Sequence, residues 1–144
     1  MGLRTSRRYD SDWEGLPYTT GDRSVVAATN VDHAASGHMG PVKNQGSCGS
    51  CWAFSATSTM EGTIGAKTGV SPPPRISEQQ QVDCNRDYKG CDGGSMTGVY
   101  RHWKREGAVL EEDYEYSARD RSCKEDRYDR YFEKDVVNTW EKLE

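Results

Sequence analysis

The chain has 144 residues and a formal net charge of −4; 33% of its residues are hydrophobic and 29% are charged. This length and composition fit one domain with a modest core. Lys and Arg are outnumbered by Asp and Glu and are spread along the chain, which argues against a nucleic-acid-binding protein. No apolar run reaches the roughly 18 residues that a membrane-spanning helix needs.

Residues 1–30 are predicted to form an N-terminal extension. They are polar, and residues 1–10 contain no apolar stretch, so no secretory signal is visible. Residues 1–6 match the pattern for N-myristoylation, which is short enough to occur by chance. Contact with a membrane is therefore expected only if Gly2 is acylated.

The next element is a helix predicted to begin at Ser50 or Cys51 and to run to about Ile64. Its apolar residues recur at helical spacing and form one stripe. They are Trp52, Ala53, Phe54, Ala56, Met60 and Ile64. Gly65 and Gly69 are expected to end this helix.

Two shorter helices are predicted to follow. The Ser-x-x-Gln sequence at 77–80 has the form of a capping box, which indicates that a second helix begins there. A third helix is expected after Gly93 and Gly94, because four apolar residues lie at positions i, i+3, i+4 and i+7. They are Met96, Val99, Tyr100 and Trp103. Gly107 is expected to end this helix.

Residues 127–144 form a charged tail in which the apolar residues are loosely helical in spacing. They are Tyr128, Tyr131, Phe132, Val136, Trp140 and Leu143. The tail could be a helix that packs on its own domain or a helix that docks on a partner. We favour the docking helix, because a partner is expected to cover the face around Trp52, as argued below.

The five cysteines are Cys48, Cys51, Cys84, Cys91 and Cys123. An odd number suggests two disulfides and one free, reactive thiol. Stable disulfides are typical of an oxidising compartment.

Cys51 is the candidate nucleophile. It stands at the predicted start of a helix, where unpaired backbone N–H groups and the helix dipole favour a thiolate. The backbone N–H of Cys51 and the side chain of Gln45, six residues upstream, are expected to form an oxyanion hole. The small residues Gly49 and Ser50 would let a substrate backbone lie close to the sulfur.

The sequence around Cys51, Cys-Gly-Ser-Cys-Trp, resembles the nucleophile segment of the papain-like, cathepsin-type cysteine proteases. Residues 77–84 and 90–94 match two further blocks of that family in the same order. The resemblance covers residues 31–126 and implies an α+β fold class. The expected domain is the mainly helical left lobe of the papain fold, held by disulfides, without the β-rich right lobe.

The resemblance also assigns roles to individual residues. It implies that Cys48 pairs with Cys91 and Cys84 with Cys123, which leaves Cys51 free. It gives Cys51 and Gln45 the nucleophile and oxyanion roles described above. It places Gly93 and Gly94 on a rail that pairs with the substrate backbone along an exposed edge. Met96 would form one wall of the pocket for the second residue before the cleaved bond. It implies no cofactor and no metal, and a lysosomal, vacuolar or secreted protein.

Cys48 and Cys51 also form a CxxC pair, which could be redox-active or bind zinc. Zinc would need two more ligands, and no second CxxC or close Cys/His pair is present. A thioredoxin-like site should follow a strand in a βαβ pattern, which the sequence lacks. Both alternatives are therefore disfavoured.

Papain-like catalysis also needs an imidazole to hold the thiolate and to protonate the leaving amine. The family places its His and Asn roughly 130–150 residues after the cysteine, whereas 93 residues follow Cys51 in this chain of 144. His102 lies in the predicted third helix, and His33 and His38 precede Cys51. We therefore expect the isolated chain to be inactive.

Three functions remain open at this stage. The chain is part of a cysteine endopeptidase that acts on peptides or proteins, a catalytically silent subunit of a larger complex, or a peptide-binding module that does not cleave. In each case we expect another protein chain to cover the face around Cys51 and Trp52. Without the right lobe, an apolar surface there would be exposed.

Overall fold

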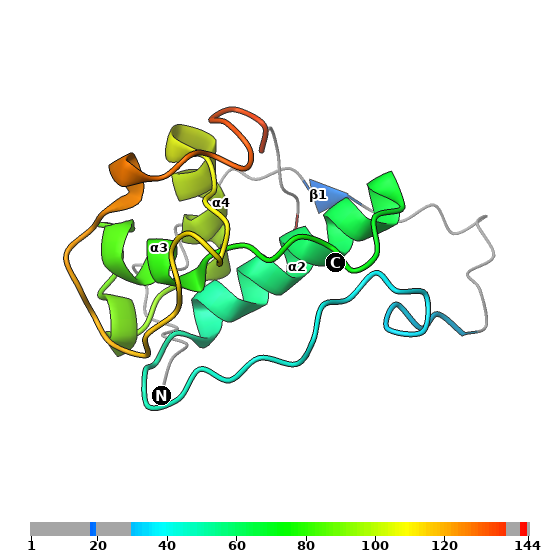
Figure 1. Ribbon diagram of the computed structural model, residues 1–144, viewed down its shortest axis with the longest axis horizontal. Coiled ribbons are helices and arrows are strands. Elements are labelled where there is room, and N and C mark those ends of the chain that lie inside the picture. The colour runs from blue at the N-terminus through cyan, green and yellow to red at the C-terminus, as the bar shows by residue number, and fades with distance from the viewer. Residues whose placement is uncertain (1–17, 20–29, 138–141, 144) are drawn as a thin grey trace.

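The computed structural model describes residues 18–19, 30–137 and 142–143. Most of the expected N-terminal extension, including Gly2, therefore lies outside the described residues, as does Trp140 of the tail. Figure 1 shows one long helix, α2 (Cys51–Thr68), crossing the molecule. The shorter helices α3 (Glu78–Cys84) and α4 (Met96–Glu106) gather beside its N-terminal half. This arrangement places the start of α2 next to the densest part of the fold.

Helix α2 begins where it was expected but continues past Gly65 and ends at Gly69. The backbone of Gly69 is left-handed, with φ of 73°, and its N–H donates to the carbonyl of Gly65. Gly65 has a packing role instead, because a Cβ atom there would lie 3.3 Å from the backbone of His38. The prediction that Gly65 ends the helix was therefore wrong, and the prediction for Gly69 is confirmed.

Helix α3 starts at its predicted cap. The Ser77 hydroxyl accepts from the backbone N–H of Gln80 at 3.1 Å. The reciprocal half of the capping box does not form, because the Gln80 Oε1 accepts from the N–H of Val109 and the Ser77 N–H donates to the carbonyl of Val109 instead. Helix α4 ends as predicted at Gly107, whose φ of 75° is in the left-handed region.

The core forms where α2 and α4 meet, around the fully buried Trp52. The Trp52 indole lies 5.4 Å from the ring of Tyr88 and donates to the carbonyl of Gly90 at 3.2 Å. Val99 and Trp103 of α4 belong to the same buried cluster. The expectation that the face around Trp52 is exposed without a second lobe was therefore wrong, since this domain covers Trp52 itself.

Three consecutive glutamines of α3, Gln79, Gln80 and Gln81, are completely buried. Their amides bond to distant segments: Gln79 to the carbonyl of Arg119, Gln80 to the N–H of Val109, and Gln81 to the ring of His102. Buried amides need such partners. Helix α3 therefore acts as a polar cross-link between the segments that surround it.

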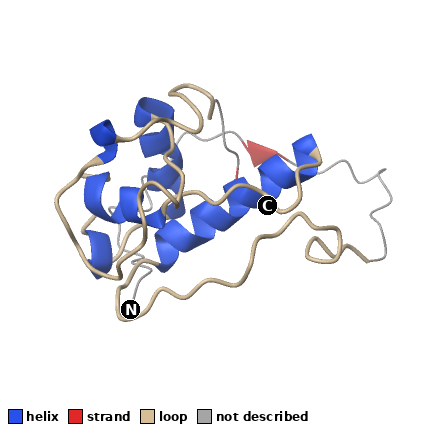
Figure 2. Ribbon diagram, viewed as in Figure 1, coloured by secondary structure: helices blue, strands red, loops and turns tan. Residues whose placement is uncertain are grey.

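Extended structure is sparse among the described residues, as Figure 2 shows. Strands β1 (Tyr18–Thr19) and β2 (Lys142–Leu143) form a parallel pair. Two isolated bridges join Ile76 to Leu110 and Ala108 to Phe132. The short 3-10 helices η2 (Gly90–Asp92) and η3 (Glu125–Arg127) complete the mainly helical fold. Within the described ranges, no helix is long and apolar enough to cross a membrane.

Within the tail, residues 128–137 contain turns and an isolated bridge rather than the expected docking helix, and residues 142–143 form β2. The backbone of Ala108 pairs with Phe132 and Tyr131. The Phe132 ring lies 5.9 Å from that of Trp103, and Val137 is buried in the same core. This part of the tail therefore packs on its own domain.

Candidate active site

Cys51 is the first residue of α2 and the one free cysteine of the chain's five. The other four form the disulfides Cys48–Cys91 and Cys84–Cys123, which confirms the expected pairing. Ser50 precedes the helix, and its carbonyl accepts from the N–H groups of the first turn. The partly exposed thiol thus stands at a helix N-terminus.

The loop that leads to Cys51 is tied down at both ends. The Gln45 side-chain amide donates to the carbonyl of Cys48 at 2.8 Å. The N–H of Gly49 donates to the carbonyl of Cys91 at 2.9 Å, beside the disulfide that joins Cys91 to Cys48. A glutamine amide has a second N–H. That donor is the one with which Gln45 could bind an oxyanion.

Gly93 and Gly94, which were expected to contact substrate, are buried in the structure, and the sequence did not indicate this. Gly94 is buried, and a Cβ atom there would lie 2.5 Å from the Trp52 indole. Gly93 is also buried, and its N–H and carbonyl bond to Gly90 and Lys89. Both glycines are therefore buried in the fold, and Gly94 lies against the Trp52 indole.

Ser50 and Met96 are also partly committed to the fold. Ser50 is buried, and its hydroxyl lies 2.5 Å from the phenol oxygen of Tyr116. Met96, the first residue of α4, is half-buried and packs against the core around Trp52. Met96 therefore lies at the edge of the hydrophobic cluster that contains Trp52.

A buried charge cluster anchors the segment before Gln45. The Lys43 ammonium lies 2.7 Å from Glu61 on α2 and 2.6 Å from Glu78 on α3. The Thr57 hydroxyl also donates to Glu78, and the N–H of Ile76 donates to Glu61. One cation thus holds two carboxylates and three chain segments together.

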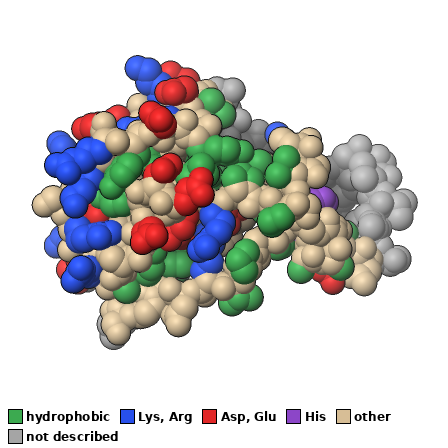
Figure 3. Space-filling model, in the orientation of Figure 1, with side chains coloured by type: hydrophobic (Ala, Val, Ile, Leu, Met, Phe, Trp, Pro, Cys, Tyr) green, Lys and Arg blue, Asp and Glu red, His purple; other side chains and the backbone are tan. Residues whose placement is uncertain are grey.

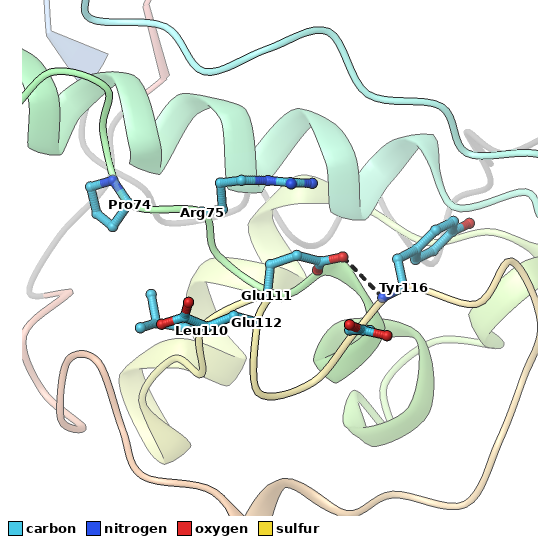
Figure 4. Close-up of a pocket in the computed structure, with 7 residues that line it drawn as sticks. Pro74, Arg75, Leu110, Glu111, Glu112 and Tyr116 are labelled. Atoms are coloured by element: carbon cyan, nitrogen blue, oxygen red, sulfur yellow. Dashed lines mark hydrogen bonds between the residues drawn. The ribbon is translucent and has the colours of Figure 1, made fainter.

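Glu111 and Tyr116 border this cluster and line a cavity of about 540 Å³ (Figure 4). The Glu111 carboxylate accepts from the backbone N–H of Tyr116 at 2.9 Å. Burial raises the pKa of Glu111 to about 7, and the negative charge of Glu78 adds to the rise; the bond from Tyr116 and the charges of Arg75 and Lys43 oppose it. No local sequence signal marks this pair, because it stands 60 or more positions after Cys51.

Comparison with known proteins agrees with this geometry. Residues 27–143 match the family described as papain family cysteine protease. The chain belongs to the papain family of cysteine proteases. It is 41% identical over 123 residues to a cathepsin L-like proteinase of Fasciola hepatica and 38% identical over 131 residues to cathepsin K of Mus musculus. These alignments cover 83% and 85% of the chain and 36% of each relative.

Solved structures give the same result. A cysteine protease of Carica candamarcensis in complex with E-64 matches with a TM-score of 0.69 and 33% identity, over 75% of this chain and 50% of that one. The digestive procathepsin L2 proteinase of Tenebrio molitor matches with a TM-score of 0.65 and 35% identity, over 89% and 38%. The chain therefore spans about a third to a half of the papain-family proteins it matches.

None of the three histidines of this papain-family chain is placed to serve Cys51. The backbone of His38 packs against Gly62 and Gly65, and Gly62 is already about 17 Å along α2 from Cys51. The His33 ring lies beside that of His38, with centroids 6.0 Å apart and the ring planes tilted by 43°. His102 is buried on α4.

His102 is bonded on both ring nitrogens. Its Nε2 lies 3.5 Å from Glu125, and its Nδ1 lies 3.1 Å from the Gln81 amide. Burial would raise the pKa of Glu125, but the bonds from His102 and Gln80 outweigh it and hold that pKa below its usual value. His102 is therefore a structural residue of the papain-family domain.

The CxxC alternatives also fail on geometry. Cys48 is bonded to Cys91, so it does not form a redox pair with Cys51. In the part of the chain that the structure describes, the one group with metal-ligand spacing is Cys84, Cys123 and Glu125. Both of its sulfurs are consumed by a disulfide.

Proposed function

We propose that this chain is the nucleophile-bearing part of a papain-family cysteine endopeptidase. The observation that carries the proposal is one free thiol at the first residue of α2, reached through a loop that contains Gln45. The Cys51 sulfur attacks the carbonyl carbon of a peptide bond in a peptide or protein substrate. The backbone N–H of Cys51 and the second N–H of Gln45 donate to the resulting oxyanion.

Substrate contacts are assigned on the same basis. Gly49, two residues before the nucleophile, is half-buried and leaves room for a peptide backbone. Met96 offers an adaptable apolar surface for a side chain. Gly93 and Gly94, shortly before Met96 in the chain, are assigned to the contact with the peptide backbone.

The general base comes from outside these 144 residues, either from further sequence of the same protein or from a separate chain. Cys51 and Ser55 lie one turn apart on the same face of α2. Ser55, Thr59 and Thr63 form an exposed face of α2 beside a hollow of about 500 Å³. We propose that the region that supplies the base, whether further sequence of the same protein or a separate chain, covers this face.

Apolar side chains are exposed near this face of α2 and could contact a partner. Met39 is partly exposed and Val42 is fully exposed on the extended segment that precedes α2 in the chain. Figure 3 shows apolar atoms between interspersed acidic and basic side chains over one side of the molecule. A contact of mixed character fits such a surface better than a purely apolar one.

A second candidate is a protease-like protein that does not cleave, either a silent subunit or a peptide-binding module. The position of all three histidines favours it. The two disulfides and the cathepsin relatives support an oxidising compartment for either candidate: a lysosome, a vacuole or the cell exterior.

The first experiment is the rate of Cys51 alkylation by iodoacetamide between pH 5 and pH 9 on the non-reduced protein, read by peptide mass spectrometry. Cys51→Ser is the matched control, since it removes the one free thiol. Labelling at pH 5 at a rate near that at pH 8 means that a cation holds the thiolate, and peptide cleavage is then assayed. An ordinary thiol has a pKa of about 8.5. Labelling confined to that range supports the non-cleaving candidate, and no labelling at any pH contradicts a nucleophilic Cys51.

A further inference from the structure

One phenol, that of Tyr116, bridges the two ends of the loop before Cys51. It donates to the backbone carbonyl of Gln45 at 2.8 Å and lies 2.5 Å from the Ser50 hydroxyl. A phenol has one proton to donate. Because Gln45 takes that proton, Ser50 must be the donor in the second bond.

The Tyr116 side chain is itself held in place. Its ring meets the ring of Phe54 edge-on, with centroids 4.8 Å apart. Burial raises the pKa of Tyr116, so the phenol keeps its proton and stays a donor to Gln45 at physiological pH. The bond from Ser50 opposes that rise without reversing it.

The backbone of Tyr116 is held by Glu111, as the dashed line in Figure 4 shows. The other carboxylate oxygen of Glu111 is buried and has no hydrogen-bond partner among the residues that the structure describes. The hydrogen bond that the Glu111 side chain makes within the described residues is therefore the one from the backbone N–H of Tyr116. In that view the Glu111 carboxylate points to the backbone of Tyr116, and the Tyr116 ring extends away from it.

We propose that Tyr116 is a positioning residue for the Cys51 site and that Glu111 holds it in place. Through Gln45 it fixes the backbone from which the oxyanion-binding amide extends. Through Ser50 it fixes the residue that leads into the helix and the N–H of Cys51. Its effect on chemistry rests on the function proposed above, whereas its effect on the loop does not.

Amide hydrogen exchange of the full chain tests the effect on the loop. Tyr116→Phe removes the phenol oxygen and keeps the ring contact with Phe54. We expect amides in residues 45–51 to exchange about ten-fold faster, because the loop loses two hydrogen bonds. Tyr114→Phe is the matched control, since it removes the bond of a buried tyrosine to Asp83 elsewhere. Equal protection of residues 45–51 in Tyr116→Phe and the wild type overturns the proposal.

The effect on the site is read with two reagents. A peptide aldehyde adds the Cys51 sulfur to its carbonyl carbon, and the carbonyl oxygen takes the thiol proton and lies in the oxyanion hole. Iodoacetamide loses iodide to the same sulfur and needs no oxyanion hole. We expect Tyr116→Phe to weaken aldehyde binding about ten-fold and to leave the alkylation rate within about two-fold.

Variants of Glu111 complete the test. Glu111→Gln keeps an oxygen for the N–H of Tyr116 and should behave as the wild type, whereas Glu111→Ala should reproduce Tyr116→Phe. An aldehyde that binds wild type and Tyr116→Phe equally overturns the positioning role. An aldehyde that fails to bind even the wild type, while exchange of residues 45–51 still rises in Tyr116→Phe, overturns the proposed function and leaves the positioning role confirmed.

Discussion

Replacing Lys43 with methionine tests the buried charge cluster that anchors the nucleophile loop. The Lys43, Glu61 and Glu78 side chains are 9%, 3% and 1% exposed, and the ammonium lies within 2.7 Å of both carboxylates. Methionine keeps most of the packing volume and removes the cation. Two buried carboxylates are then left with one hydrogen bond each, from Ile76 and Thr57.

Breaking a buried ion pair from one side costs about 3–5 kcal/mol, because the remaining charge has no counter-charge. A domain of this size is stable by about 5–15 kcal/mol. Lys43→Met should therefore remove a large part of the free energy of unfolding. With a urea slope of about 2 kcal/mol per M, the midpoint should fall by about 2 M.

Urea unfolding with both disulfides intact measures this cost. Lys67→Met is the control, since Lys67 is an exposed lysine of α2 and its loss should cost under about 1 kcal/mol. The double variant Lys43→Met with Glu78→Gln should recover part of the loss, because one stranded charge is gone. A loss under about 1 kcal/mol in Lys43→Met would refute the assignment of this cluster as a buried anchor.

Three further predictions follow from the same packing. Burial raises the pKa of Glu111 from 4.5 to about 7, so the folded chain binds the extra proton between those values and its free energy of unfolding falls as pH rises through that window. We expect the free energy of unfolding to change by about 1–2 kcal/mol less between pH 4 and pH 8 in Glu111→Gln than in the wild type, after allowance for solvent screening. Urea unfolding at a series of pH values measures this, and the same pH dependence in both proteins contradicts the prediction. Gly94→Ala should cost about 1–3 kcal/mol and shift tryptophan fluorescence, because its Cβ would lie 2.5 Å from the Trp52 ring; a neutral effect would mean that the ring moves freely. Replacing Cys84 and Cys123 with serine should lower stability by about 4 kcal/mol from loop entropy, since the bridge spans 39 positions; thermal unfolding unchanged from wild type argues against it.

Local signals predicted the elements well. Ser77 caps α3, and Gly69 and Gly107 end α2 and α4, because each signal depends on hydrogen bonds or backbone angles within a few residues. The signal at Gly65 misled because a glycine can also serve close packing, here against His38. The helical spacing of the tail misled because the pairing of Phe132 with Ala108 outweighs a weak periodicity.

The candidate site was predicted in part. Cys51 lies at the start of α2 as expected, and the disulfides pair as the family resemblance implied. The partners that hold the site were not predictable. Tyr116 and Gln45 are 71 positions apart in the sequence. No sequence pattern predicts a hydrogen bond between residues so far apart.

The sequence by itself determined the family, the free thiol and its place at a helix start. These properties follow from short motifs, whose effects depend on residues that are close together in the sequence. The tertiary structure alone decided that Trp52 is buried under Gly94, that the glutamines of α3 are internal, and that His102 serves Glu125 instead of Cys51. Buried polar groups and aromatic rings must find partners wherever the fold brings them, and only the packed chain sets which segments meet.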